Sequence, residues 1–283
     1  MPGHGEVDDV GGPTVTRVGF VGLGDIGTPM ACRLAERFEV AVWARRPEAT
    51  AAALGGGAQR VDRLTDLGAC DVVGVCVTDG EAVQAVVEGL VPGLVEGTVV
   101  CIHSTVAPDL IEGLDELVRS SGAALIDAPV SGGADAAAVG RLRVMAGGDP
   151  AALDRCRDVL DQLGTVLVMG GVGSGQRTKL LNNALYTAQL ALAAEILGIA
   201  ESFNLDRDAV VAAIGGGSGA SFALGRLQTV AAPSRAGHVA RLLTKDLALF
   251  EQASGARGDV VAAVARPFLD VLERRHTQED QRG

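Results

Sequence analysis

Short apolar runs alternate with longer amphipathic segments between Arg17 and Gly170. Several of these runs are continuous stretches of Val and Ile, which is typical of strands that helices cover on both faces. Regular alternation of such strands with helices predicts an α/β fold with a doubly wound parallel sheet. The expected strands are 17–23, 40–44, 71–77, 98–103, 123–128, 142–146 and 165–169.

After residue 170 the strand pattern stops and helix-forming sequence replaces it. Residues 176–202 contain no proline, and Ser174 is placed to act as the N-cap of a helix about 40 Å long. The segment 191–200 carries a single charge, on Glu195, so we expect most of this helix to be buried between domains or against another subunit. Further helices are expected near 208–214, 222–230, 238–253 and 259–274. The second part of the chain should therefore be all helical.

Composition indicates a globular protein that holds any anionic ligand by local contacts. Of 283 residues, 48% are hydrophobic and 21% are charged, and the net charge of −11 argues against a broad nucleic-acid surface. The longest charge-free stretches contain amides or many glycines, so no membrane span is expected. Met1–Thr14 lacks the basic and apolar parts of a signal peptide. We expect a soluble cytoplasmic protein.

The pattern of cysteines also predicts a cytoplasmic protein. They are odd in number and scattered, so we interpret them as reduced core residues and expect neither disulfides nor a metal site. The cysteines are Cys32, Cys70, Cys76, Cys101 and Cys156.

A glycine-rich turn follows the first expected strand. Its sequence is Gly22-Leu23-Gly24-Asp25-Ile26-Gly27, which matches G-x-G-x-x-G. The match alone is weak, but an apolar strand precedes the turn, and an amphipathic helix that includes Met30 and Leu34 follows it. Such glycines allow a tight turn and close approach of a pyrophosphate to a helix N-terminus. We predict a Rossmann-type dinucleotide site; the alternative is an ordinary strand-to-helix turn.

The second expected strand bears on the choice of cofactor. An NAD site would have an acidic residue about 20 residues after the glycines, to bind the ribose 2′-hydroxyl. Here the strand ends in Arg45 and Arg46, whose guanidinium groups could bind the 2′-phosphate of NADP. We therefore expect NADP(H) to be favoured over NAD(H); the alternative is a solvated pair of loop arginines.

Polar residues share one face at the start of the long helix. Lys179, Asn182 and Asn183 stand at i, i+3 and i+4 in a segment otherwise rich in Leu and Ala. Burial near a helix N-terminus would lower the pKa of the lysine and suit it to proton transfer. The alternative is an exposed lysine beside a capping amide.

Taken together, these motifs resemble the β-hydroxyacid dehydrogenase family, in the branch of 3-hydroxyisobutyrate dehydrogenase and glyoxylate/succinic semialdehyde reductase within the 6-phosphogluconate dehydrogenase superfamily. The resemblance spans about Arg17 to Leu249 and follows the family's motif order. The further motifs that carry it are Ser104-Thr105-Val106-Ala107-Pro108, Asp127-Ala128-Pro129-Val130-Ser131-Gly132-Gly133 and Leu243-Thr244-Lys245-Asp246-Leu247.

The resemblance implies a role for each matched residue. Lys179 would be the general acid/base for hydride transfer between a nicotinamide cofactor and a small β-hydroxyacid or its semialdehyde. Asn183, with Asn182 beside it, would orient the substrate. The roles implied elsewhere are carboxylate binding by Ser131, Gly132 and Gly133, lining of the nicotinamide ribose by Val77 and Thr105, and closure over the cofactor by Lys245. The alternatives are ordinary turns for the first two groups and a surface ion pair for Lys245.

The same resemblance suggests how the chain is divided and assembled. We expect a disordered tail at 1–15, an NAD(P)-binding Rossmann domain at 16–172 and an all-helical domain for substrate binding and dimerisation at 173–283. The long apolar helix predicts a homodimer or a larger homo-oligomer, with a small carboxylate-bearing molecule as substrate.

Some positions depart from the family pattern and leave the substrate open. His103 stands where relatives often have an acid or Asn, Arg141 interrupts a Gly-Thr-Leu run, and His238 replaces a frequent aromatic. Arg177 adds a cation near the expected pocket. Two alternatives follow: an imine reductase on the same scaffold, which Lys179 disfavours, and a dinucleotide-binding module without turnover.

Overall fold

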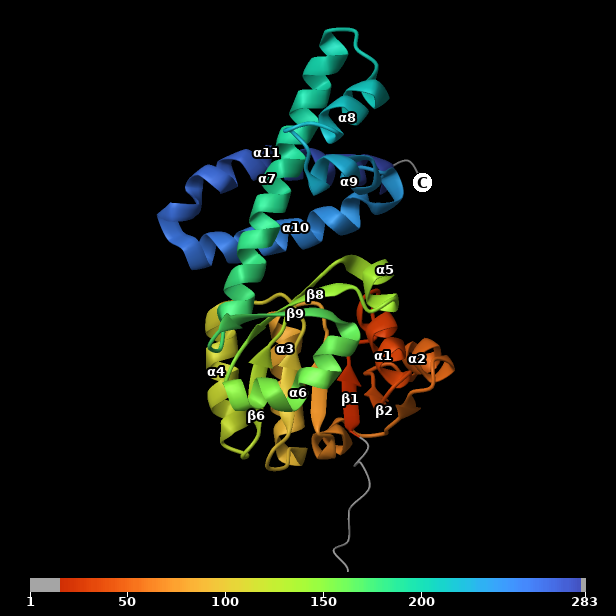
Figure 1. Ribbon diagram of the computed structural model, residues 1–283, viewed down its shortest axis with the longest axis vertical. Coiled ribbons are helices and arrows are strands. Elements are labelled where there is room, and N and C mark those ends of the chain that lie inside the picture. The colour runs from red at the N-terminus through yellow and green to blue at the C-terminus, as the bar shows by residue number, and fades with distance from the viewer. Residues whose placement is uncertain (1–15, 281–283) are drawn as a thin grey trace, which may run out of the picture.

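The computed structural model describes residues 16–280, which form a sheet flanked by helices and a separate layer of helices above it (Figure 1). This is the predicted architecture of a Rossmann-like sheet followed by an all-helical part. The expected tail at residues 1–15 lies outside the described residues. The strands are β1 (Arg17–Val21), β2 (Glu39–Trp43), β3 (Gln59–Arg60), β4 (Val72–Val75), β5 (Val99–Ile102), β6 (Ala124–Asp127), β7 (Val130–Ser131), β8 (Leu142–Gly147) and β9 (Gly164–Gly170).

The sheet has the strand order β3-β2-β1-β4-β5-β6-β8-β7, and β9 pairs with β8. Strands β1 to β6 pair in parallel, and the order reverses between β1 and β4, where ligands of such sheets bind beyond the carboxyl ends of the strands.

The structure differs from the predicted sheet at its last strands. Strand β8 pairs antiparallel with both β6 and β7. The segment between β7 and β8 is too short for a parallel crossover, which needs a dozen or more residues. Strands β3 and β7 were not predicted, because two residues are too few to show a strand pattern.

Helices cover both faces of the sheet, as the continuous Val and Ile runs predict. Strands β4 and β5 are buried at every position. One buried cluster joins β1 and β8 to α1 and α6, and a second joins β4 and β5 to α3 and α4. These helices, with the shorter ones, are α1 (Gly27–Ala35), α2 (Ala51–Gly55), α3 (Gly80–Leu90), α4 (Pro108–Arg119), α5 (Gly133–Ala138) and α6 (Pro150–Leu163).

The helical part has a core of its own, built around the long helix α7, which rises from the sheet. Its helices are α7 (Ser174–Ser202), α8 (Arg207–Gly215), α9 (Phe222–Val230), α10 (Pro233–Ser254) and α11 (Asp259–Asp280). Helix α7 begins earlier than predicted. Gly173, at φ 82°, is the N-cap residue, so the prediction of Ser174 in that role is wrong by one position.

Helix α7 is long and apolar enough, by length and composition alone, to cross a membrane. The core helix of a folded protein has the same composition, because protein covers it in place of lipid. Helix α7 packs against α9, α10 and α11, and it starts at the sheet. Its apolar character is therefore explained in part by this core.

Candidate active site

The glycine loop, Gly22–Gly27, joins β1 to α1 and needs its glycines for two different reasons. A Cβ on Gly22 (φ 95°) would lie 2.1 Å from the carbonyl oxygen of Cys76, and one on Gly27 would lie 1.8 Å from that of Gly22. Packing and backbone conformation therefore require glycine at both ends of the loop. At Gly24 a Cβ would meet no atom within 4 Å, and the N-terminus of α1 has no side-chain cap.

The open position at Gly24 fits a dinucleotide. No contact within the described residues requires glycine at this position. Close approach of a pyrophosphate to the uncapped N-terminus of α1 would require it, because a side chain would occupy the same space. Leu23, Asp25 and Ile26 complete the loop. The loop's residues therefore match the cradle that a dinucleotide phosphate requires.

Arg45 and Arg46 follow β2, next to the glycine loop in the sheet. The parallel register pairs Trp43 with Val21, so the carboxyl ends of β2 and β1 lie side by side. Both arginines are exposed, and neither side chain has a hydrogen bond or ion pair within residues 16–280. They are free to bind an anion at the adenosine end of the expected cofactor site.

The ends of β4 and β5 are joined by a buried serine that was not singled out from the sequence. The backbone N–H of Val77 donates to Ser104 Oγ at 2.8 Å. The carbonyl oxygen of Ser104 accepts from Gln176 Nε2 at 2.8 Å, and Gln176 Oε1 accepts from the backbone N–H of Val106 at 3.0 Å. Gln176, fully buried on α7, therefore ties the long helix to the strand ends.

Asp127, at the end of β6, supplies the N-terminal cap that α7 lacks. Its carboxylate accepts from the backbone N–H groups of Gly173 and Gln176, both at 2.7 Å. Burial raises the pKa of Asp127 to about 6, and hydrogen bonds from Gln176 and Gly173 oppose that rise. This contact fixes the start of the helix that carries Lys179.

Lys179 is buried, with 8% of its surface exposed. Burial lowers its pKa to about 8; the negative charge of Asp246 opposes this shift and the positive charge of Lys245 adds to it. The alternative of an exposed lysine is wrong. A buried amine that changes protonation near pH 8 can serve as an acid or a base in proton transfer.

Asp246 organises the groups around Lys179. Its Oδ2 accepts from Asn183 Nδ2 at 2.6 Å, and Asn183 Oδ1 in turn accepts from Asn182 Nδ2 at 2.9 Å. Its other oxygen, Oδ1, is buried, lies 3.1 Å from Lys245 Nζ and accepts no hydrogen bond. We call Lys179, Asn183, Lys245 and Asp246 the lysine cluster.

Lys245 connects the lysine cluster to the sheet through a hydrogen bond. Its Nζ donates to the carbonyl oxygen of Thr105, at the end of β5, at 2.8 Å. It also forms an ion pair with its neighbour Asp246, which confirms the alternative interpretation of an ion pair; closure over the cofactor stays a prediction. Farther along the same interface, His238 Nε2 on α10 lies 4.0 Å from Asp25 Oδ2 in the glycine loop. Helix α10 therefore lies over the loop.

Ser131, Gly132 and Gly133 stand where β7 ends and α5 begins, and we call these three residues the Ser131 loop. Gly132 and Gly133 have φ of 138° and 76°, and a Cβ on Gly133 would meet no atom within 4 Å. This conformation leaves the backbone open to a ligand, as at Gly24. The structure records no hydrogen bond between this loop and the lysine cluster, so the two are not joined directly.

Two of the departures from the family pattern have structural roles. His103 is buried, its Nδ1 lies 2.9 Å from the carbonyl oxygen of Ala128, and it stacks on Phe20. Burial lowers the pKa of His103 to about 4.

Arg177 pairs with Glu112 of α4 at 2.7 Å, so the expectation that it adds a cation to the pocket is wrong. Two residues rotate a helix by about 200°, which turns Arg177 away from Lys179.

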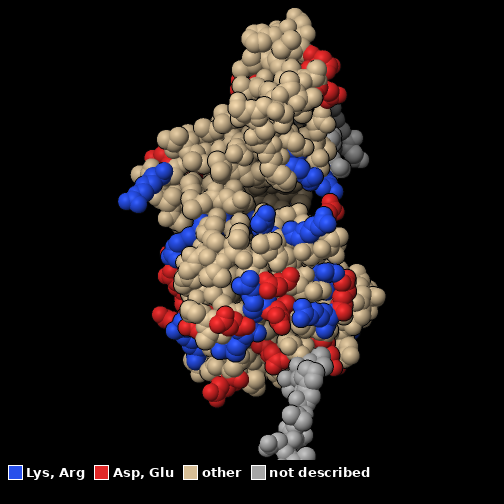
Figure 2. Space-filling view, in the orientation of Figure 1, with Lys and Arg blue, Asp and Glu red and all other residues tan. Residues whose placement is uncertain are grey.

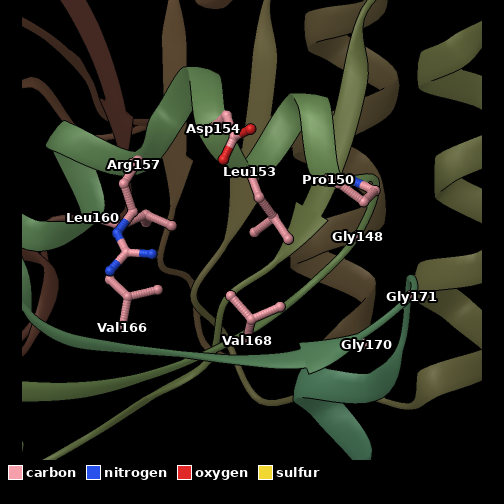
Figure 3. A pocket seen from close by; sticks show the side chains of 10 residues that line it. All are labelled: Gly148, Pro150, Leu153, Asp154, Arg157, Leu160, Val166, Val168, Gly170 and Gly171. Atoms are coloured by element: carbon pink, nitrogen blue, oxygen red, sulfur yellow. The ribbon is translucent and has the colours of Figure 1, made fainter.

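Other candidate sites are weaker. A pocket of about 420 Å³ lies between α6 and β9, lined by apolar residues that include Leu153, Leu160, Val166 and Val168 (Figure 3). It contains no residue of the glycine loop or the lysine cluster. Within residues 16–280, no group of three His, Cys, Asp or Glu side chains could hold a metal ion.

Family models match both parts of the chain. Residues 17–171 match the NAD binding domain of 6-phosphogluconate dehydrogenase, and residues 173–281 match the NAD-binding domain of NADP-dependent 3-hydroxyisobutyrate dehydrogenase.

Curated relatives cover most of the chain. A probable 3-hydroxyisobutyrate dehydrogenase of Mycobacterium bovis is 31% identical over 86% of this chain and 87% of its own length. The NAD-dependent L-serine dehydrogenase of Pseudomonas aeruginosa is 29% identical over 85% of this chain and 86% of its own. The 2-(hydroxymethyl)glutarate dehydrogenase of Eubacterium barkeri is 31% identical over 74% of this chain and 71% of its own.

Solved structures agree with these relatives. Mycobacterium tuberculosis 3-hydroxyisobutyrate dehydrogenase with L-serine has a TM-score of 0.83 at 26% identity and covers 93% of this chain and 95% of its own. Psf3 in complex with NADP+ and 2-OPP has a TM-score of 0.82 at 28% identity, over 92% and 99% of the two chains.

Proposed function

We propose a reaction for this chain from the premise that it belongs to the β-hydroxyacid dehydrogenase family, as a 3-hydroxyisobutyrate dehydrogenase-like, NAD(P)-dependent enzyme acting on CH–OH groups. The reaction is the interconversion of a small β-hydroxyacid and its semialdehyde or keto acid. The observation that carries the proposal is the buried Lys179, held beside Asn183 and Asp246 beneath the helix that covers the glycine loop.

Lys179 acts as the general acid/base. The nicotinamide, when bound, accepts or supplies the hydride. In oxidation the neutral Lys179 amine takes the hydroxyl proton of the substrate, and in reduction the ammonium form returns it to the developing alkoxide. Asn183, whose amide Asp246 holds in one orientation, positions the substrate oxygen with Asn182 beside it.

The remaining residues bind and enclose the reactants. Ser131, Gly132 and Gly133 bind the substrate carboxylate through a hydroxyl group and backbone N–H groups. Val77 and Thr105, at adjacent strand ends, line the ribose of the nicotinamide. Lys245 links α10 to Thr105 and closes the site over the cofactor. We propose the boundary between the Rossmann domain and the helical domain at residues 172 and 173, just before α7 begins at Ser174, with groups from both domains contributing to the site.

Turnover on a substrate panel tests the reaction. The purified protein is assayed with NADP(H) and NAD(H) against L-serine, 3-hydroxyisobutyrate, their semialdehydes and cyclic imines. We expect oxidation of hydroxyacids and reduction of semialdehydes, and none of cyclic imines. Tight NADPH binding with no turnover would contradict the proposal and favour the binding module, and imine reduction alone would favour an imine reductase.

We further propose that NADP(H) is favoured over NAD(H), because Arg45 and Arg46 are unpaired at the end of β2. Arg45→Ala should raise the Kd for NADPH about 10-fold or more and leave that for NADH nearly unchanged, since only NADPH has a 2′-phosphate. Fluorescence titration with each cofactor measures both. The control is Arg60→Ala, which removes a neighbouring exposed arginine that pairs with Asp62. Equal losses for both cofactors would rule out the role of Arg45.

We propose a homodimer formed through α7. Five apolar side chains on one face of this helix and a sixth at its C-cap, Phe203, are 41–67% exposed; the five are Leu181, Leu185, Leu192, Ile196 and Ile199. In Figure 2 the helical part also shows few charges compared with the sheet part. A continuous exposed apolar stripe of this kind is typical of a subunit interface, and a self-complementary helix face suits two-fold symmetry.

Leu185→Asp should convert the dimer to monomers, because it places a charge within this stripe, at a side chain that is 57% exposed in the monomer. Sedimentation velocity measures the change in mass. Val95→Asp, at a 49% exposed apolar position outside the helix, is the matched control and should leave the dimer intact. A monomeric wild-type protein would contradict the proposal.

A further inference from the structure

An arginine, Arg143, lies on β8, the strand that pairs with β7 at the Ser131 loop. The antiparallel register places Arg143 of β8 directly opposite Ser131 of β7, and Val144 opposite Val130. Residues opposed in this way point to the same face of a sheet, with their Cβ atoms about 5 Å apart. Val130 and Val144 belong to the buried cluster on one face. Ser131 and Arg143 therefore lie together on the opposite face.

That opposite face is the one beneath the helical part. The cluster that contains Val130 and Val144 is formed with α1 and α6, whereas α7 packs against β8 and α10 lies above β8 and α5 (Figure 1). Figure 2 shows Lys and Arg side chains along the lower rim of the hollow between the two parts. Arg143 is thus placed at the side of the cleft where the Ser131 loop would hold a carboxylate.

Arg143 and its neighbour Arg141 are both exposed and have no hydrogen bond or ion pair from their side chains in the described part of the chain. Arginines on adjacent helices are paired: Arg33 with Glu36, and Arg157 with Asp161. Two unpaired guanidinium groups beside a carboxylate-binding loop, in a chain of net charge −11, concentrate positive charge locally. A planar guanidinium group can donate two parallel hydrogen bonds to the oxygens of a carboxylate or a phosphonate.

We infer that Arg143, assisted by Arg141, forms an anion subsite that selects β-hydroxyacids with a second anionic group on the side chain, either a carboxylate or a phosphonate. The inference rests on the proposed function, because it assigns the first carboxylate to the Ser131 loop. Among the residues that would contact substrate, Arg143 then determines specificity and Lys179 performs the chemistry.

A matched pair of substrates tests the subsite. 3-Hydroxyisobutyrate and 2-(hydroxymethyl)glutarate share the reacting CH₂OH and the first carboxylate, and only the second has a distal carboxylate; a phosphonate analogue of the latter separates the two anion types. We expect kcat/KM to favour the dianionic compounds by about 10-fold or more. Arg143→Ala should lower kcat/KM for them about 10- to 100-fold and change that for 3-hydroxyisobutyrate less than about 2-fold.

Two further variants sharpen this test. Arg143→Lys keeps the positive charge but loses the planar guanidinium group, so it should retain part of the preference for dianionic substrates. Arg119→Ala, on the 60% exposed side chain that pairs with Asp115 of α4, is the control and should change nothing. Equal losses on both substrates, or no preference in the wild type, would overturn the inference.

Binding without turnover separates this inference from the proposed function. Glutarate and butyrate are titrated by calorimetry into the wild-type protein and Arg143→Ala, each with NADPH present. Tighter binding of glutarate that depends on Arg143 supports the subsite even where no hydroxyacid is oxidised, in which case the proposed function alone fails. Turnover of monocarboxylates with equal binding of both acids overturns the subsite alone.

Discussion

Replacing Lys179 with Ala is expected to lower kcat about 10²- to 10⁴-fold, the usual contribution of general acid–base catalysis. The expectation follows from burial of this amine, the fall of its pKa to about 8, and its place beside Asn183 and Asp246. Steady-state kinetics on the best hydroxyacid of the panel measures the loss. NADPH binding should be unchanged, because the glycine loop lies on another element.

Two more variants test whether Lys179 acts by proton transfer, by its positive charge alone or by supporting the fold. Lys179→Met keeps most of the side-chain volume, so it should fold, and it should lose activity to the same extent as Lys179→Ala. Lys179→Arg keeps the positive charge but cannot release a proton at accessible pH, so it should also be inactive. Full activity in Lys179→Ala, or activity in Lys179→Arg close to that of the wild type, would rule out the acid/base role.

The pH dependence of the wild type should reveal the same group. Oxidation needs the neutral amine, so its kcat should rise with pH through about 8 and level off above it. Reduction needs the ammonium form, so its kcat should be constant below about 8 and fall above it. Profiles that run in the same direction for both reactions would exclude Lys179 as the shared proton carrier.

Local patterns explain why part of the site could be predicted from the sequence. Lys179 and Asn183 were found together because helix geometry alone places i and i+4 on one face. The glycine loop was found because its strand and helix flank it directly. Each of these predictions depends on residues a few positions apart.

The parts that were missed depend on contacts between distant segments. Asp246 meets Asn183 across 63 residues, and Asp127 caps α7 across 46. Both residues stand in motifs that were recognised, but a motif does not show which atoms its carboxylate will meet. Arg143 was missed for a related reason: its place opposite Ser131 follows from an antiparallel pairing in which one strand has only two residues.

A side chain at Gly24 is expected to abolish tight cofactor binding without unfolding the protein. Gly24→Val should raise the Kd for NADPH about 100-fold or more, because crowding at the phosphate and lost hydrogen bonds to a charged group together cost roughly 3 kcal/mol. Its Tm should stay close to that of the wild type, since a Cβ there meets no atom within 4 Å and the backbone φ is not positive. Fluorescence titration and thermal unfolding measure the two quantities.

Two other glycines supply controls, one for the loss of cofactor binding and one for the retained Tm. Gly113→Val stands in α4, where a Cβ also meets no atom within 4 Å, and should leave cofactor binding unchanged. Gly27→Ala places a Cβ 1.8 Å from the carbonyl oxygen of Gly22 and should lower Tm as well as binding. If Gly24→Val binds NADPH as tightly as the wild type, the space at Gly24 is not kept for a pyrophosphate. Loss of binding in Gly24→Val alone, with its Tm retained, would assign that space to the cofactor.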